Sequence, residues 1–293
     1  MSNAPGPTTG IRRRWTLGLV VGVALAAAAA AAVVVVVLVS HHASAAPIPI
    51  SPSEHDVTRW APPRTPPLSD ASAAALVTHR PEQRPANHAA NDYVPTDAQL
   101  AAFQAARNDK GRRIIAVNPL LRYVTGRPGL EQPSTDDLIQ WASHKWGIPT
   151  SWIRAQVQYE SGWHQSQLGD KRPVSKAVYL RYPAFSRVPG ARAVYESLGI
   201  AQVKWTPNGA VGAGTEPLRW ESTAFNLDYY AATLRYFYDG RCRWCSRPYG
   251  PGQPWQTVGA WYEPTPWANH LARHYIKVVK QRLAQRAWTK SGF

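Results

Sequence analysis

Apolar residues in the second half of the chain recur at the spacing of helices. After Thr150, residues Ile153, Val157 and Glu160 fall at i, i+4 and i+7, which places them on one helix face. Further helices are predicted from about 222 to 238 and from about 266 to 288. No alternating pattern of convincing length indicates a strand. The pattern therefore predicts a mainly α-helical domain.

The predicted helices have recognisable ends. Ser134-Thr-Asp-Asp137 supplies a helix cap and an acidic first turn, and Gly147 followed by Pro149 supplies a stop. In the last helix the residues expected to face inward are Leu271, Tyr275, Val278 and Leu283. We place the domain at residues 134–293, which is long enough for one sizeable core.

The region before residue 134 reads differently. Thr96-Asp97 can cap a short helix to about Arg107, within a connecting segment of residues 96–133. Residues 40–95 contain ten prolines from Pro47 to Pro95 and few aromatic residues, a composition that predicts a disordered, extended linker.

The N-terminus carries a membrane signal. Residues 1–15 are basic, and the 24 residues from Thr16 to Val39 are uncharged, about the length that crosses a bilayer. Basic residues before the segment predict a cytoplasmic N-terminus, with the C-terminal domain outside the cell membrane. Ala43-Ser-Ala45 offers a cleavage site, so the alternative is secretion after cleavage near Ala45.

The net positive charge of the chain indicates which class of partner it would attract. Residues 1–46 contain three arginines and no acidic residue, so the remainder keeps 30 of the 33 basic residues against 18 acidic ones. Such a chain is attracted to polyanions, among them anionic cell-wall polymers and lipid headgroups. No nucleic-acid motif accompanies the charge, and we expect no nucleic-acid partner.

Two cysteines, Cys242 and Cys245, are the only ones in the chain. Outside the cytoplasm they can form a small disulfide, whereas a zinc site would need two further ligands of which there is no local sign. Two idle thiols are the alternative. We expect no metal and no cofactor.

Glu160 is the most informative residue. It is a lone carboxylate at the end of an apolar helix, followed by a turn and by Trp163. Such a carboxyl tends to stay protonated near neutral pH, as a general acid that protonates a leaving oxygen must be.

Further motifs follow Glu160 in a fixed order. Glu160-Ser161 is followed by Ser197-x-Gly199-x-x-Gln202, then by an aromatic helix with Asn226, then by Ala260-x-Tyr262. This order resembles the lytic transglycosylase domain of the lysozyme-like superfamily. The resemblance covers about residues 134 to 288, roughly half of the chain. It implies a lysozyme-like helical fold.

The resemblance also implies a reaction. Glu160 would protonate the bond between N-acetylmuramic acid and N-acetylglucosamine in peptidoglycan, and would then act as base on the sugar's own 6-hydroxyl, giving a 1,6-anhydro end. Family positions that bind the glycan fall on Ser161, Ser197, Gly199, Gln202, Asn226 and Tyr262. Tyr262 would orient the Glu160 carboxyl.

Two departures from the family pattern keep alternatives open. The gap between Glu160 and Ser197 is long and predicts a loop or lid at residues 168–196, and Glu263 follows Tyr262 where many relatives have asparagine. Glu263 would be a second carboxylate for a hydrolytic muramidase; Asp170 and Glu196 are weaker candidates. A non-catalytic cell-wall-binding scaffold, serving a secretion or division machinery, is the alternative of a different class.

Overall fold

Helices make up most of the part of the chain that the structure describes. The computed structural model describes residues 55–172, 194–205, 212–245, 250–264, 269–290 and 293. The helices are α1 (Asp70–Ala74), α2 (His88–Asn91), α3 (Asp97–Ala105), α4 (Ile114–Val117), α5 (Thr135–Trp146), α6 (Thr150–Ser161), α8 (Leu218–Glu221), α9 (Thr223–Tyr238), α10 (Pro254–Tyr262) and α11 (His270–Gln285), with 3-10 turns η1 (Pro85–Asn87), η2 (Pro119–Tyr123) and η4 (Ala287–Thr289). The predicted mainly α class is confirmed.

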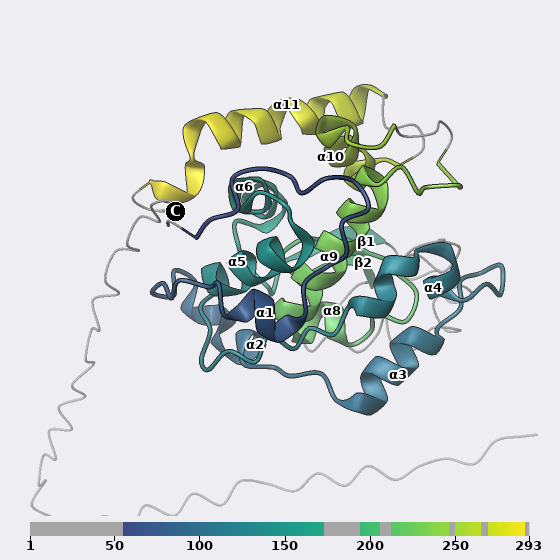
Figure 1. The fold of residues 1–293 in the computed structure, drawn as a ribbon, viewed down its shortest axis with the longest axis horizontal. Coiled ribbons are helices and arrows are strands. Elements are labelled where there is room, and N and C mark those ends of the chain that lie inside the picture. The colour runs from purple at the N-terminus through teal and green to yellow at the C-terminus, as the bar shows by residue number, and fades with distance from the viewer. Residues whose placement is uncertain (1–54, 173–193, 206–211, 246–249, 265–268, 291–292) are drawn as a thin grey trace, which may run out of the picture. The chain divides into compact units, whose positions relative to one another are not determined.

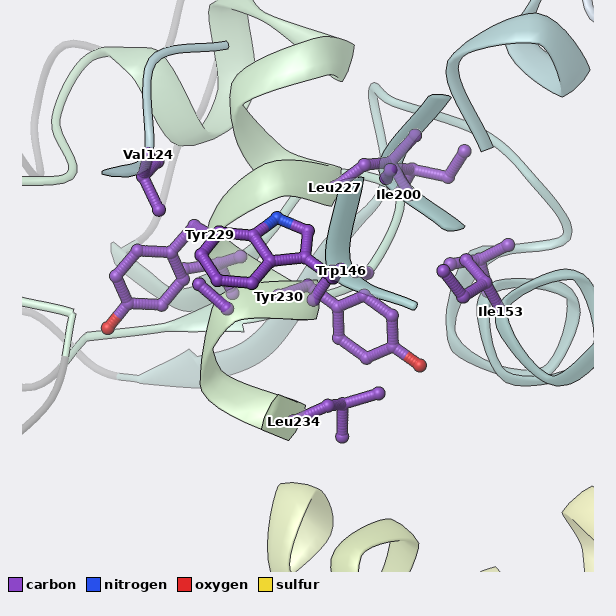
Figure 2. Close-up of a cluster of buried hydrophobic side chains, with 14 of the residues drawn as sticks. Val124, Trp146, Ile153, Ile200, Leu227, Tyr229, Tyr230 and Leu234 are labelled. Atoms are coloured by element: carbon purple, nitrogen blue, oxygen red, sulfur yellow. The ribbon is translucent and has the colours of Figure 1, made fainter. Parts of the chain in front are cut away.

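Helix α9 forms the centre of the core. Each of its residues is buried, and α5 and α10 pack directly against it (Figure 1). It begins where the Ser222 hydroxyl accepts a hydrogen bond from the Phe225 amide at 3.1 Å. Figure 2 shows Tyr229 and Tyr230 projecting to different sides of this helix, Tyr230 toward Ile153 of α6. The helix predicted at 222–238 is confirmed.

Helix α5 carries the predicted cap and stop, and both α5 and α6 end at a glycine. The Ser134 hydroxyl accepts from the Asp137 amide at 3.1 Å, and the Asp137 carboxylate accepts from the Ser134 amide at 3.0 Å. Gly147 ends α5 with φ +58°, and Gly162 ends α6 with φ +61°, a left-handed conformation that glycine adopts without strain. These ends fix where the last turn of α6, and therefore Glu160, is placed.

A small antiparallel sheet was not predicted. Its strands are β1 (Leu168–Arg172), β2 (Val194–Leu198) and β3 (Val203–Lys204), in the order β1-β2-β3, with Gly169 opposite Ser197. The buried Arg219 guanidinium donates to the carbonyls of Glu196 in β2 and Val203 in β3 and so holds these two strands together. The ends of the predicted 168–196 loop are thus strands; residues 173–193 lie outside the described residues.

The prediction of a disordered linker through Pro95 is wrong from residue 55 onward, and the domain does not begin at 134. Trp60 stacks on Tyr238 with ring centroids 4.5 Å apart, and the Leu68 amide donates to the Lys145 carbonyl at 2.9 Å. Asp70 of α1 forms an ion pair with buried Lys145 at 2.6 Å. The segment is irregular, as its prolines require, but single anchoring side chains bind it to α5 and α9.

Two further predictions concern the ends of the chain. The last helix runs from His270 to Gln285, with Tyr275 buried, but Leu271, expected inside, is 45% exposed. Within the described ranges, no helix is both long and apolar enough to cross a membrane. The segments predicted at 1–15 and 16–39 lie outside the described residues, as does the linker up to 54.

Candidate active site

The last turn of α6 places Glu160 at the wall of a pocket of about 460 Å³. The pocket lies between the small sheet, α9, α10 and the start of α11. Its lining residues are Glu160, Asp170, Ser197, Gln202, Lys204, Tyr229, Thr233, Phe237, Trp244, Ala260, Trp261, Tyr262, Glu263, Pro264 and Leu271. Three of these residues are carboxylates, one is a lysine and five are aromatic.

Two neutral donors hold one oxygen of Glu160. The Tyr275 hydroxyl donates to Oε1 at 2.5 Å, and the Trp261 indole N–H donates to the same oxygen at 3.1 Å. No hydrogen bond from a described residue reaches Oε2. The carboxyl group is therefore fixed in orientation while one oxygen remains for a ligand in the pocket.

Burial raises the pKa of Glu160 to about 7, because the charged form loses water. The hydrogen bonds from Tyr275 and Trp261 act in the opposite direction, and the nearby negative charge of Asp170 raises the pKa further. A carboxyl with this pKa exists in both protonation states near neutral pH. It can give up a proton and take one back at little cost.

An aromatic shell surrounds the carboxyl group. The Tyr275 ring stacks on Tyr262 at 5.0 Å and meets Tyr159 edge-on at 5.4 Å. Tyr230 of α9 packs edge-on against Trp261 at 4.8 Å. Burial raises the pKa of Tyr275 well above its ordinary value, and Glu160 raises it further, so this hydroxyl stays a donor.

A second carboxylate, Asp170 of β1, lines the same pocket. Its Oδ2 accepts from the Ser197 hydroxyl at 2.6 Å and from the Lys204 ammonium at 2.9 Å. Lys204 also lies 3.7 Å from the carboxylate of Glu196, which is 6% exposed. Asp170 is thus held by a cation, unlike Glu160. Of the three carboxylates weighed as second groups, Asp170 and Glu263 line the pocket.

The structure places four further predicted residues on the pocket wall beside Glu160, namely Ser197, Gln202, Tyr262 and Glu263. Ser197 is turned to Asp170, and the Gln202 amide donates to the Gly199 carbonyl at 2.9 Å. Tyr262 is 47% exposed at the pocket. The sequence motifs therefore converge on one place.

Two of the predicted binding residues, Ser161 and Asn226, form hydrogen bonds within the fold. The Ser161 hydroxyl donates to the Ile200 carbonyl at 2.7 Å, which ties α6 to the turn after β2. Asn226 is fully buried; its amide donates to the Leu198 carbonyl at 2.9 Å, and its oxygen accepts from the Ala201 amide at 2.9 Å. Neither residue is among those that line the pocket, and their contact with a ligand stays a prediction.

Gly199 is needed for packing. It has φ +84°, and a Cβ there would lie 2.1 Å from the Asn226 amide nitrogen and 2.5 Å from the Arg219 carbonyl oxygen. The glycine admits the side chain of Asn226, whereas we predicted that it admits a sugar. In the Ser197-x-Gly199-x-x-Gln202 motif, Gly199 therefore serves packing, whereas Ser197 and Gln202 line the pocket.

Tyr262 was expected to orient Glu160, and that prediction is wrong. Tyr275 and Trp261 donate to the carboxyl, and Tyr262 supports the Tyr275 ring. Tyr275 stood among the inward residues of the last helix. A tyrosine at an inward position needs a partner for its hydroxyl, and this was the signal that could have identified it.

The cysteine prediction is resolved, since Cys242 and Cys245 form a disulfide. Over the described ranges, no three histidine, cysteine or acidic residues lie close enough together to hold a metal ion. The disulfide brackets Trp244, one of the residues that line the pocket.

No protein-family model, curated protein or solved structure matches this chain. A functional interpretation therefore depends on the motif order and on the geometry of the Glu160 pocket.

Proposed function

We propose that this chain is a peptidoglycan lytic transglycosylase with a lysozyme-like domain, and that Glu160 is its general acid and then its base. One observation carries the proposal: a carboxyl group with a pKa of about 7 lies on a pocket wall, with one oxygen held by Tyr275 and Trp261. Metal-independent glycan cleavage needs such a group.

The reaction balances with one carboxyl group. Protonated Glu160 gives its proton to the oxygen that joins C1 of N-acetylmuramic acid to C4 of N-acetylglucosamine, and the C1–O bond breaks with both electrons going to that oxygen. The Glu160 carboxylate then takes the proton of the muramyl 6-hydroxyl group. At the same time the oxygen of that hydroxyl group bonds to C1. The products are a free 4-hydroxyl and a 1,6-anhydro end, and Glu160 is protonated again.

Tyr275 and Trp261 support both halves of this cycle. Their hydrogen bonds favour the charged carboxylate that forms after the first proton transfer, while burial favours the protonated form that precedes it. Because both donors are neutral, neither fixes the carboxylate in its charged state.

A hydrolytic muramidase is the second candidate, and Asp170 favours it. This carboxylate lines the same pocket and is held by Ser197 and Lys204. It could direct a water molecule to C1, in which case the product has an ordinary reducing end. The two reactions share Glu160 as acid and differ only in the oxygen that attacks C1.

The proposed setting is the outer side of the cell membrane. Residues 16–39 would anchor the chain in a single pass, and release after cleavage near Ala45 is the alternative. The partners would be peptidoglycan glycan strands and, through them, a secretion or division machinery. The excess of basic residues would hold the domain on the anionic wall.

The test is digestion of isolated peptidoglycan by the full chain in detergent, with mass spectrometry of the soluble fragments. Wild type should release fragments with anhydro-muramyl ends, and Glu160→Gln should fold and bind the wall but lose about 10² to 10⁴ in rate. Asp97→Asn, at an exposed residue of α3, is the matched control and should retain full rate.

Each other product has a definite meaning. Fragments with ordinary reducing ends would show that the chain is a hydrolytic muramidase. Binding to the wall without release of fragments would support the non-catalytic wall-binding scaffold. Near-full activity of Glu160→Gln would remove Glu160 from the reaction.

A further inference from the structure

A second pocket, of about 580 Å³, lies beside the Glu160 pocket. It is formed by α4 and the end of α9, both labelled in Figure 1, and by the segment that follows α9. Its lining residues are Arg64, Arg112, Ala116, Val117, Pro119, Tyr236, Gly240, Arg241, Arg243 and Trp244. Four arginines and no acidic residue are among them, and we call it the arginine pocket.

One acidic residue, Asp239, lies next to the arginine pocket, and its oxygens already have partners. Its Oδ1 accepts from the Arg64 amide at 2.8 Å and lies 3.3 Å from the Arg235 guanidinium, and its Oδ2 accepts from Arg241 at 3.1 Å. Within the described residues, the guanidinium groups of Arg64, Arg112 and Arg243 form no ion pair. The pocket therefore carries a net positive charge.

Three separate segments bring these arginines together. The Arg112 amide donates to the Asn108 side chain at 3.0 Å, the Arg64 backbone is bound by Asp239, and the Cys242–Cys245 disulfide closes the turn that holds Arg243. Like charges that converge repel one another and cost stability. An anion bound among them would offset this cost.

The arginine pocket also has aromatic rings in its lining, which can contact an apolar surface of a ligand. Tyr236 and Trp244 line it beside the arginines, and aromatic faces pack well on the apolar faces of sugar rings. Trp244 also lines the Glu160 pocket, so the two pockets meet at this residue.

We propose that the arginine pocket binds a phosphorylated sugar unit of an anionic wall glycopolymer, with the phosphate among Arg64, Arg112 and Arg243 and the sugar against Trp244. A phosphate offers oxygens in several directions and so can accept hydrogen bonds from guanidinium groups of different segments. A planar carboxylate instead offers its two oxygens to a single guanidinium group. This inference needs no catalytic role for Glu160.

The test is isothermal titration of the full chain in detergent with N-acetylglucosamine 1-phosphate. Arg112→Ala/Arg243→Ala should weaken binding at least tenfold; both side chains are exposed, so the fold should be retained. The matched control is Lys277→Ala/Lys290→Ala, which removes the same charge at exposed residues elsewhere and should bind within twofold of wild type.

Three comparisons decide the chemistry of the ligand. N-acetylglucosamine and glucuronate should each bind at least tenfold more weakly than the sugar phosphate, and inorganic phosphate should bind more weakly as well. Equal binding of glucuronate would overturn the choice of phosphate, and equal binding of inorganic phosphate would overturn the sugar contact. Equal losses in the arginine and lysine variants would reduce the effect to net charge and overturn the site.

Glu160→Gln separates this proposal from the enzymatic one. It should bind the sugar phosphate as wild type does, whatever happens to glycan cleavage. A loss of binding in this variant would place the probe in the Glu160 pocket and contradict the assignment to the arginine pocket.

Discussion

Two successive helices carry a carboxylate each, one fully buried and one partly buried, and the two carboxylates have opposite kinds of partner. Asp136 of α5 is fully buried, and both of its oxygens accept from the Arg154 guanidinium, at 2.7 and 2.8 Å. Among the described residues, Glu160 of α6 accepts from two neutral groups, Tyr275 and Trp261, both at Oε1. One carboxylate is paired with a cation in the core; the other lies on a pocket wall.

The difference shows how partners decide what a buried carboxylate can do. Burial alone would lower the pKa of Arg154, but Asp136 and Asp56 more than offset this and raise it above its ordinary value. The Arg154–Asp136 ion pair joins α6 to α5 in the core and so serves the fold. Among the described residues Glu160 has no cationic partner, and burial raises its pKa to about 7, which leaves it able to exchange protons.

The largest effect is expected from breaking the charged pair. Asp136→Asn leaves the Arg154 guanidinium buried with only Asp56 as a charged partner, and should lower the free energy of unfolding by about 3 to 5 kcal/mol. Urea denaturation measures this. Asp97→Asn, which removes an exposed ion pair with Arg127, is the control and should cost less than about 1 kcal/mol. If both variants lost a similar free energy of unfolding, the buried ion pair would be no more important to the fold than the exposed one.

The second effect has the opposite sign. The folded pKa of Glu160 lies above its ordinary value of 4.5, so the folded state binds the extra proton, and stability falls as pH rises from about 4.5 to 7. A difference between 4.5 and about 7 corresponds to roughly 3 kcal/mol at about 1.4 kcal/mol per pH unit. Glu160→Gln should therefore be more stable than wild type by up to about 3 kcal/mol at pH 8, and nearly equal to it at pH 4.

The difference between the two proteins is the quantity to measure, by thermal unfolding at both pH values. Burial also raises the pKa of Glu216 to about 7, but this group is present in both and cancels. A Glu160→Gln variant that is less stable than wild type at pH 8 would mean that the carboxylate is favourably placed in its charged form.

The smallest effect sharpens the role of the neutral donors. The Tyr275 hydrogen bond lowers the pKa of Glu160, so Tyr275→Phe should raise it, by about one unit for a bond worth about 1.4 kcal/mol. Since the proposed acid step needs protonated Glu160, the alkaline limb of the rate profile should move up by the same amount. Tyr159→Phe, whose ring meets Tyr275 edge-on, is the control and should leave the limb in place.

The sequence predicted the elements whose signals are local. Helix caps at Ser134 and Ser222 and the stop at Gly147 lie within a few residues of what they control, and α5, α6 and α9 follow the predicted bounds closely. The pocket wall was predicted in part, because motif order places Ser197, Gln202 and Tyr262 near Glu160.

What the sequence could not provide depends on contacts between distant residues. Tyr275 donates to a residue 115 positions away, and Arg219 holds strands too short to show alternation. Residues 55–95 have the composition of a linker, yet Trp60 and Asp70 bind partners on α9 and α5. Isolated anchors of this kind leave no periodic pattern.

The proposed reaction requires that the Glu160 carboxyl group change its charge near neutral pH. The most direct test is a titration of the Glu160 side-chain carboxyl carbon by NMR in the full chain in detergent, with its signal assigned by its loss in Glu160→Gln. The expected midpoint is about pH 7. A midpoint near the ordinary value of 4.5 would contradict the account, because Glu160 would then be ionised at neutral pH and unable to serve as the acid.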